Sequence, residues 1–260
     1  MKVCILGSGS SGNCIYINSQ DTSILIDAGL SGKEICKRLR QIGINPSSLA
    51  AVVLSHEHTD HIQGIRGLYH THKLPIFANL ATKKVVEDKF ERIKVSDVFK
   101  TGHNFCVGNF YLETFSVSHD AVDPVGFNIF AEDCKVSIAT DLGYVTHLVK
   151  ERLKQSNLIA LESNYDPEML INGPYPWEIK QRIKGNKGHL SNIQCEDLLK
   201  EIVDEKTSHI VLAHISETNN LYDLAHLTIK KGLEDYGIDK AIDLTIGWQD
   251  RCGDILELRD

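Results

Sequence analysis

The chain has 260 residues, of which 42% are hydrophobic and 24% charged, a balance typical of an ordinary globular protein. No stretch reaches the roughly 18 apolar residues of a membrane span, and the first apolar segment is too short for a signal peptide. The net charge of −7 argues against binding nucleic acid through overall charge, so such a partner would need a local basic patch and bound metal.

Seven cysteines are scattered along the chain without a C-x-x-C pair. An odd, dispersed set favours free thiols in a reducing compartment over a disulfide framework or a cysteine zinc site. We therefore expect a cytoplasmic protein.

The first predicted strand, residues 3–6, ends in the small-residue loop GSGSSGN. The run that follows, 14–17, is again typical of a strand, so the helix of a dinucleotide-binding glycine motif is missing. The loop is either a tight turn or a place where the backbone comes near a site, with Ser8, Ser10 and Asn13 facing substrate. A third strand over 23–26 and an amphipathic surface helix over 31–42 follow.

The segment HEHTDH follows the apolar run 50–54, which is typical of a short buried strand. His56 and His58 are two residues apart, so both rings would project to one side of an extended segment. Asp60 is the predicted N-cap of a helix that begins near His61. Three imidazoles and a carboxylate this close together suit zinc or a similar divalent ion better than a polar loop.

This strand-associated H-x-H-x-D-H pattern resembles the metal motif of the metallo-β-lactamase fold, a superfamily of mostly binuclear metallohydrolases. The resemblance implies that Asp27, just after the third strand, supports the metal-binding histidines without binding metal itself. His119, just past the strand that ends near 118, would complete a set with His56 and His58. His214, after the last strongly buried strand, would be the third ligand of a second ion.

Asp141 follows the predicted strand 135–139, which pairs with 125–131 as a hairpin. An aspartate at a strand end can hold two ions through its two oxygens, so Asp141 is the candidate bridging ligand. Alternatively, it is the N-cap of a helix over 144–154.

A polar insertion over 172–192 has four cations, two aromatic residues and a single acidic residue. It is either a solvated helix and loop or a surface for phosphate backbones, with aromatics for packing or stacking. It ends in GHLSN, where Ser191 is the predicted N-cap of a helix through 203 whose free N–H groups would suit a phosphate oxygen. The expected substrate contacts of this region are Lys180, Arg182, Lys184, Lys187, His189, Ser191 and Asn192.

Strands interspersed with helices fill two halves that meet near residue 130, without a linker or repeat. We predict one domain over 1–260 of the α/β (α+β) class. Its architecture would be the four-layer αβ/βα metallo-β-lactamase sandwich, with two mixed sheets face to face and helices outside.

Seven candidate ligands at five strand ends or turns would hold two divalent ions, Zn²⁺ or Mn²⁺, that share a water. Two ions about 3.5–4 Å apart lower the pKa of that water and stabilise the entering and leaving oxygens of a hydrolysis. Hydroxide would attack a phosphorus, carbonyl or sulfonyl centre, with Asp60 and His189 as catalytic residues. The first ion takes His56, His58 and His119, the second takes Asp60, His61 and His214, and Asp141 bridges them.

Eight motifs spread over residues 7–220 carry a narrower resemblance. They are GSGSSGN, LIDAG, HEHTDH, SVSHDA, TDLG, LESNYD, GHLSN and LAHISETNN. Together they resemble the YycJ/WalJ subfamily, which implies a cytoplasmic bacterial 5′-to-3′ exonuclease on double-stranded DNA, with DNA-repair proteins as partners. By the same analogy His189 contacts the scissile phosphate, stabilising charge or protonating the leaving oxygen; otherwise it only marks a helix entry.

Metal ligands do not choose the substrate. The nearest alternative is an RNA-processing, cyclic or small-molecule phosphodiesterase. A thioester or lactam hydrolase and a non-catalytic, metal-stabilised DNA-binding module are further alternatives. The sequence indicates no oligomeric state.

Overall fold

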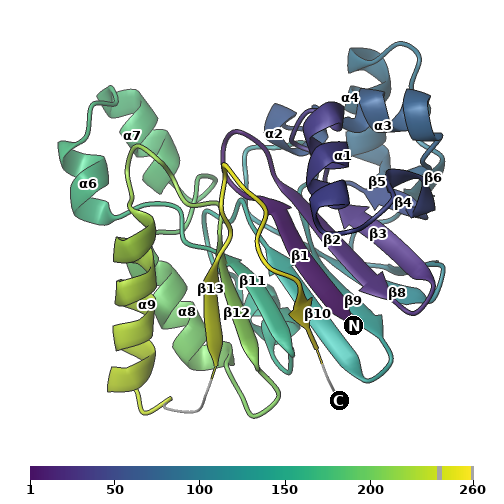
Figure 1. The fold of residues 1–260 in the computed structure, drawn as a ribbon. Helices are drawn as coiled ribbons and strands as arrows, with labels where there is room; N and C mark the ends of the chain where they lie inside the picture. The colour runs from purple at the N-terminus through teal and green to yellow at the C-terminus, as the bar shows by residue number, and fades with distance from the viewer. Residues whose placement is uncertain (239–241, 259–260) are drawn as a thin grey trace.

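A computed structural model describes residues 1–238 and 242–258, which form two seven-stranded sheets packed face to face (Figure 1). In spatial order, the first sheet consists of β14 (Leu256–Glu257), β1 (Lys2–Gly7), β2 (Cys14–Ser19), β3 (Thr22–Ile26), β4 (Ala51–Val53), β5 (Ile76–Asn79) and β6 (Asp97–Phe99). The second consists of β13 (Asp243–Ile246), β12 (His209–Ala213), β11 (Leu158–Glu162), β10 (Cys134–Ala139), β9 (Val125–Ala131), β8 (Phe110–Ser116) and β7 (Asn104–Val107).

Both sheets are mixed, as predicted. Strands β3 to β6 are parallel neighbours, and so are β10 to β13. The remaining pairs are antiparallel, including the expected β9–β10 hairpin.

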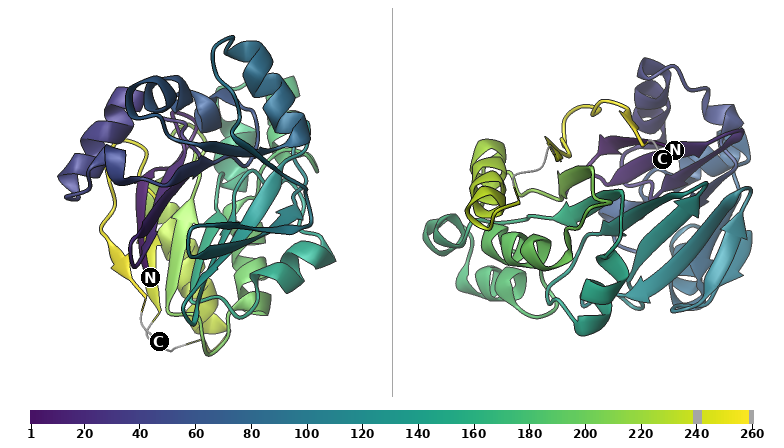
Figure 2. Two further views of the ribbon diagram at one scale, coloured as in Figure 1. Left: turned by 90° about the vertical axis from the view of Figure 1, so that its right-hand side faces the viewer. Right: turned by 90° about the horizontal axis from the view of Figure 1, so that it is seen from below.

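Helices cover the outer face of each sheet, which gives the four layers visible in Figure 2. Over the first sheet lie α1 (Gly32–Gln41), α2 (Thr59–Ile62), α3 (Ile65–His72) and α4 (Leu80–Lys89), with a short 3-10 turn, η1 (Pro46–Ser48). With the second sheet are α5 (His147–Leu153), α8 (Asn192–Ile202) and α9 (Tyr222–Asp235), while α6 (Pro167–Asn172) and α7 (Trp177–Lys184) project to one side (Figure 1). No helix among the described residues is long and apolar enough to cross a bilayer.

Alternating side chains explain why the first strands are apolar on both faces. Val3 and Ile5 of β1 point into the core between the sheets, whereas Cys4 and Leu6 point into the core beneath the helices. Successive side chains of a strand face opposite sides, so a strand sandwiched between two layers needs apolar residues at every position. Burial on both faces therefore explains the apolar runs from which these strands were predicted.

Two predicted features are placed differently by the structure, and a third falls outside the residues that it describes. The change from one sheet to the other lies between Phe99 and Asn104, not near 130, because the β9–β10 hairpin is interior to the second sheet. The N-cap of α2 is His58, whose side chain makes no cap hydrogen bond, and Asp60 lies two residues later, within the first turn of the helix. Residue 241, the expected start of the closing strand, lies outside the described residues.

Candidate metal centre

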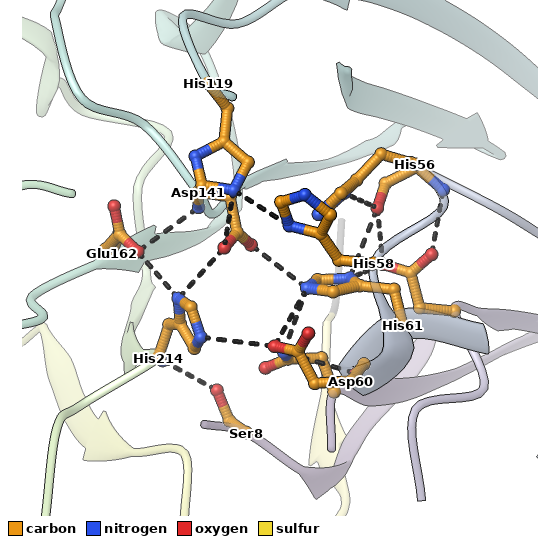
Figure 3. A network of polar contacts seen from close by, with 12 residues as sticks. Ser8, His56, His58, Asp60, His61, His119, Asp141, Glu162 and His214 are labelled. Atoms are coloured by element: carbon orange, nitrogen blue, oxygen red, sulfur yellow. Dashed lines mark hydrogen bonds and ion pairs between the residues drawn. The ribbon is translucent and has the colours of Figure 1, made fainter. Parts of the chain in front are cut away.

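The side chains predicted to bind metal meet at one edge of the two sheets (Figure 3). Parallel neighbours such as β10, β11 and β12 run in one direction, so their carboxyl ends reach the same edge. A polar residue stands at or just after each of these ends. In chain order the contributions are Asp27 after β3, the HEHTDH segment after β4, His119 after β8, Asp141 after β10, Glu162 at the end of β11 and His214 after β12.

The first cluster consists of His56, His58 and His119, the three rings grouped from the sequence. One nitrogen of each lies within 4.8 Å of the others, and Nδ1 of His58 is 3.3 Å from Nε2 of His119. A divalent ion of the zinc type is commonly held by three imidazole nitrogens at such spacings.

The second cluster surrounds Asp141. Its Oδ2 is 3.2 Å from Nε2 of His61, and its Oδ1 is 3.3 Å from Nδ1 of His214 and 3.6 Å from Nε2 of His119. The Oδ2 of Asp60 is 3.6 Å from Nε2 of His61 and 3.7 Å from Nε2 of His214. Asp141 therefore lies against both clusters, as a carboxylate shared by two ions must.

The other ring nitrogens of the cluster histidines have polar partners of their own. Nδ1 of His61 is 2.8 Å from Oδ2 of Asp27, and Nδ1 of His214 is 2.7 Å from Oε1 of Glu162. The remaining pairs are Nδ1 of His56 with Oγ of Ser55 at 2.9 Å, Nδ1 of His119 with the Gly188 carbonyl at 3.2 Å, and Nε2 of His58 with Oδ1 of Asp120 at 3.8 Å. Contacts of this kind fix the tautomer and orientation of metal-binding histidines.

Three buried atoms in this space lack a hydrogen-bond partner among the described residues: Nε2 of His56, Nε2 of His214 and Oδ2 of Asp141. Leaving a buried polar atom unpaired is costly, and native proteins rarely do so without a reason. Lone pairs that face a common space are satisfied by a cation. The donor set, imidazole nitrogens with carboxylate oxygens, therefore fits divalent metal.

Charges within the centre shift the ionisation of its members. Burial would raise the pKa of the Asp141 carboxyl, but His214 and His61 outweigh it and hold this pKa well below its usual range. Conversely, burial would lower the pKa of His61, yet Asp141 and Asp27 raise it well above the ordinary value. For His56, burial dominates and the pKa falls well below the usual value, so this ring is neutral and able to bind metal.

Three residues of the centre have a left-handed backbone: Asp27 (φ 61°), Asp141 (φ 57°) and His214 (φ 54°). This conformation is uncommon for non-glycine residues and is kept only where the surroundings fix it. Each lies one or two residues past the end of its strand, and the N–H of His214 donates to Oγ of Ser8 at 2.7 Å. The sharp turn aims each side chain into the centre.

Glu162 was not identified from the sequence. It is fully buried and accepts the N–H groups of Leu142 and Leu190 on Oε2 and that of Asp141 on Oε1. Burial would raise the pKa of Glu162, but His189 and His214 lower it to about 2. The missed signal was a carboxylate at the end of an otherwise apolar strand, where an ionised group must have partners.

His189 lies at the rim of the centre. Its Nδ1 is 2.9 Å from Oε1 of Glu162, and its ring centroid is 5.3 Å from that of His119 and 5.1 Å from that of His214. The side chain is partly exposed, so it can meet a bound substrate.

The small-residue loop after β1 contacts two histidines of the second cluster. Ser8 is buried and its Oγ accepts the N–H of His214, so it contacts the centre itself, and its contact with substrate stays a prediction. Asn13 is also buried, and its Nδ2 lies 3.0 Å from Nε2 of His61. Ser10 is exposed.

Ser191 is the N-cap of α8, as predicted, and several polar groups at this helix start are hydrogen-bonded within the protein. Its Oγ accepts the N–H of Gln194, whose side chain accepts the N–H of Ser191, a capping box. The N–H of Asn192 donates to Tyr165, and its side chain bonds to that of Asn220. The N–H groups of Ser191, Asn192 and Gln194 are thus used within the protein, and the substrate contacts of Ser191 and Asn192 stay predictions.

The four cations of the insertion lie on or beside α7, which has no buried residue. Lys180 donates to the carbonyl of Ile171, and Lys184 lies 5.0 Å from the centroid of the Trp177 ring. Arg182 pairs with Asp120 next to the first cluster, and Lys187 is exposed.

Comparisons with known proteins agree with this arrangement. The family model described as "Beta-lactamase superfamily domain" matches residues 22–215. The chain is 35% identical to the exodeoxyribonuclease YycJ of Bacillus anthracis over 244 residues, covering 92% of each chain. It is 34% identical over 249 residues to the exodeoxyribonuclease WalJ of Streptococcus pneumoniae, covering 94% and 93%. Among solved structures, zinc-bound PqqB from Methylobacterium extorquens has the same fold, with a TM-score of 0.75, 17% identity, and coverage of 99% of this chain and 100% of that one.

Proposed function

The chain belongs to the metallo-β-lactamase superfamily, in its YycJ/WalJ-like subfamily, and on this basis we propose that it is a two-metal exodeoxyribonuclease that degrades double-stranded DNA from 5′ to 3′. The single observation that carries the two-metal part is the position of Asp141 between two groups of imidazoles. The DNA part rests on the names of the two relatives.

The proposed ligands divide as the distances suggest. His56, His58 and His119 would hold one ion, with Asp141 shared. Asp60, His61 and His214 would hold the other. Asp27 would bind no ion, because its carboxylate is hydrogen-bonded to His61 and to the N–H and hydroxyl of Ser55.

When bound, divalent ions supply a nucleophilic water at neutral pH and neutralise charge on a phosphodiester. The protein provides orientation and proton transfer. Asp60, whose Oδ2 faces His61 and His214, is placed to accept a hydrogen bond from the attacking water. His189 donates a proton toward the leaving oxygen through Nε2, and Glu162, 2.9 Å from Nδ1, orients the ring.

The test is cleavage of end-labelled substrates by the metal-loaded protein. Duplexes labelled at either 5′ or 3′ ends, a structured RNA and a small phosphodiester are compared at equal concentration. The proposal predicts mononucleotide release that begins at 5′ ends of duplex DNA. Preferential cleavage of RNA or of the small diester would favour the alternative phosphodiesterases, and turnover of a thioester alone would reject the proposal.

A further inference from the structure

Asp120, the residue after His119, joins the metal centre to the projecting helix α7. Its Oδ2 accepts a hydrogen bond from Nε of Arg182 at 2.7 Å. Its Oδ1 is 3.4 Å from Nε2 of His119 and 3.8 Å from Nε2 of His58. One carboxylate therefore lies against two proposed ligands and an arginine on a different element.

The chain after α7 is fixed to the same part of the centre. Oγ of Ser118 donates to the carbonyl of Asn186 at 2.6 Å, and the carbonyl of Gly188 lies 3.2 Å from Nδ1 of His119. A Cβ on Gly143, two residues after Asp141, would come within 2.4 Å of the N of Gly188, so these backbones touch. The segment is thus anchored, while α7 itself has no buried residue and depends on Arg182 for its contact with the centre.

Arg182 differs from its three neighbouring cations in what its charged group can do. Lys180 is turned back to the carbonyl of Ile171, and Lys184 lies over Trp177. Arg182 uses Nε for Asp120, and its two terminal amino groups make no hydrogen bond within the described residues. The Arg182 side chain is 62% exposed, while Oδ1 of its partner Asp120 lies 3.4 Å from Nε2 of His119.

This geometry suits recognition of a phosphate. A guanidinium binds phosphate through two parallel N–H···O contacts made by two of its nitrogens, here called the fork. A carboxylate bound to the third nitrogen fixes the direction in which this fork points. Because Asp120 lies within 4 Å of two ring nitrogens of the first cluster, the fork stands beside the place where the scissile phosphate would sit. A phosphate that reaches the fork would be a neighbour of the scissile one along a strand.

We propose that Arg182 binds the phosphate next to the scissile phosphate, and that Asp120 is the positioning residue that holds it there. This proposal rests on the proposed nuclease function. It makes Arg182 and Asp120 the reason that the enzyme would prefer polynucleotides. A diester that has no neighbouring phosphate makes no use of the fork, so Arg182 would favour a nucleic-acid strand over a small diester.

The experiment compares wild type with Arg182→Ala, Arg182→Lys and Asp120→Asn on a duplex and on bis(4-nitrophenyl) phosphate. Losing one charge-assisted contact should raise KM for the duplex about tenfold or more. The loss in kcat/KM should be about tenfold larger on the duplex than on the small diester. Arg182→Lys should recover part of the binding, since it keeps the charge but not the fork. Lys206→Ala, an exposed cation near the amino end of β12, is the matched control.

Equilibrium binding of the duplex by metal-free protein gives a readout that does not depend on turnover. The negative slope of log affinity against log salt should become less steep by about 0.9 in Arg182→Ala, the value for one lost phosphate contact. An unchanged duplex KM and salt slope, or equal losses on both substrates, would overturn the proposal. Wild type that cuts the small diester but no nucleic acid would instead contradict the proposed function.

Discussion

Oε1 of the buried carboxylate of Glu162 lies 2.7 Å from Nδ1 of His214. The same oxygen lies 2.9 Å from Nδ1 of His189, so one carboxylate orients a proposed ligand and the proposed proton donor together. Removing its charge should therefore affect metal binding and catalysis at once.

Glu162→Gln is expected to lower metal affinity by about 10- to 100-fold, the usual effect of losing an orienting partner of a metal-binding histidine. Competition with a chromophoric chelator measures it. Glu205→Gln, an exposed carboxylate, serves as the control. Metal affinity equal to wild type would mean that Glu162 only supports the fold.

The lowered pKa of Glu162 implies that the folded protein becomes less stable in acid. The pKa of Glu162 is about 2 in the folded protein against an ordinary 4.5, so the unfolded state binds more protons between these values and stability falls as pH drops through this window. The shift corresponds to about 3 kcal/mol, fully present above pH 4.5 and lost near pH 2. Urea unfolding of metal-free wild type and Glu162→Gln from pH 2.5 to 5 should show a difference that narrows with acidification; a constant difference would contradict the assignment.

His189→Ala should retain its metals while kcat falls by about 10²- to 10⁴-fold, as expected for loss of a general acid. His147→Ala is the matched control, since His147 is exposed at the start of α5. A His189→Ala protein with full metal content and an undiminished rate would remove this role.

Gly29 is expected to tolerate no side chain. An ideal Cβ there would lie 1.6 Å from the carbonyl oxygen of Asp60, which accepts the N–H of Asn13 at 2.7 Å. Gly29→Ala should destabilise the protein by about 1–3 kcal/mol or more, because the backbone that carries Asp60 must shift. Gly253→Ala, where the nearest atom would be 3.5 Å away, is the control, and equal thermal midpoints for the two variants would refute the packing argument.

The sequence was informative where a ligand-type residue follows an apolar run. His119, Asp141 and His214 were predicted as members of one site because they stand at strand ends, and the structure brings all three together. The two mixed sheets and the metallo-β-lactamase fold were likewise predicted and are confirmed.

Long-range contacts could not be predicted from local patterns. Nothing near Asp120 in the sequence indicates Arg182, 62 positions away, as its partner. Ser8 makes another such contact, since its buried Oγ accepts the N–H of His214, 206 positions away. Glu162 was overlooked because its partners come from three other strand ends and loops.

The central claim is that imidazoles and carboxylates from separate strand ends hold a pair of divalent ions. Elemental analysis of purified wild type, His58→Ala and Asp141→Ala after reconstitution tests it most directly, with His70→Ala as an exposed-histidine control. The account predicts two ions per chain in wild type and His70→Ala, and fewer than two with no detectable turnover in the other variants. Wild-type stoichiometry and activity in Asp141→Ala would contradict it.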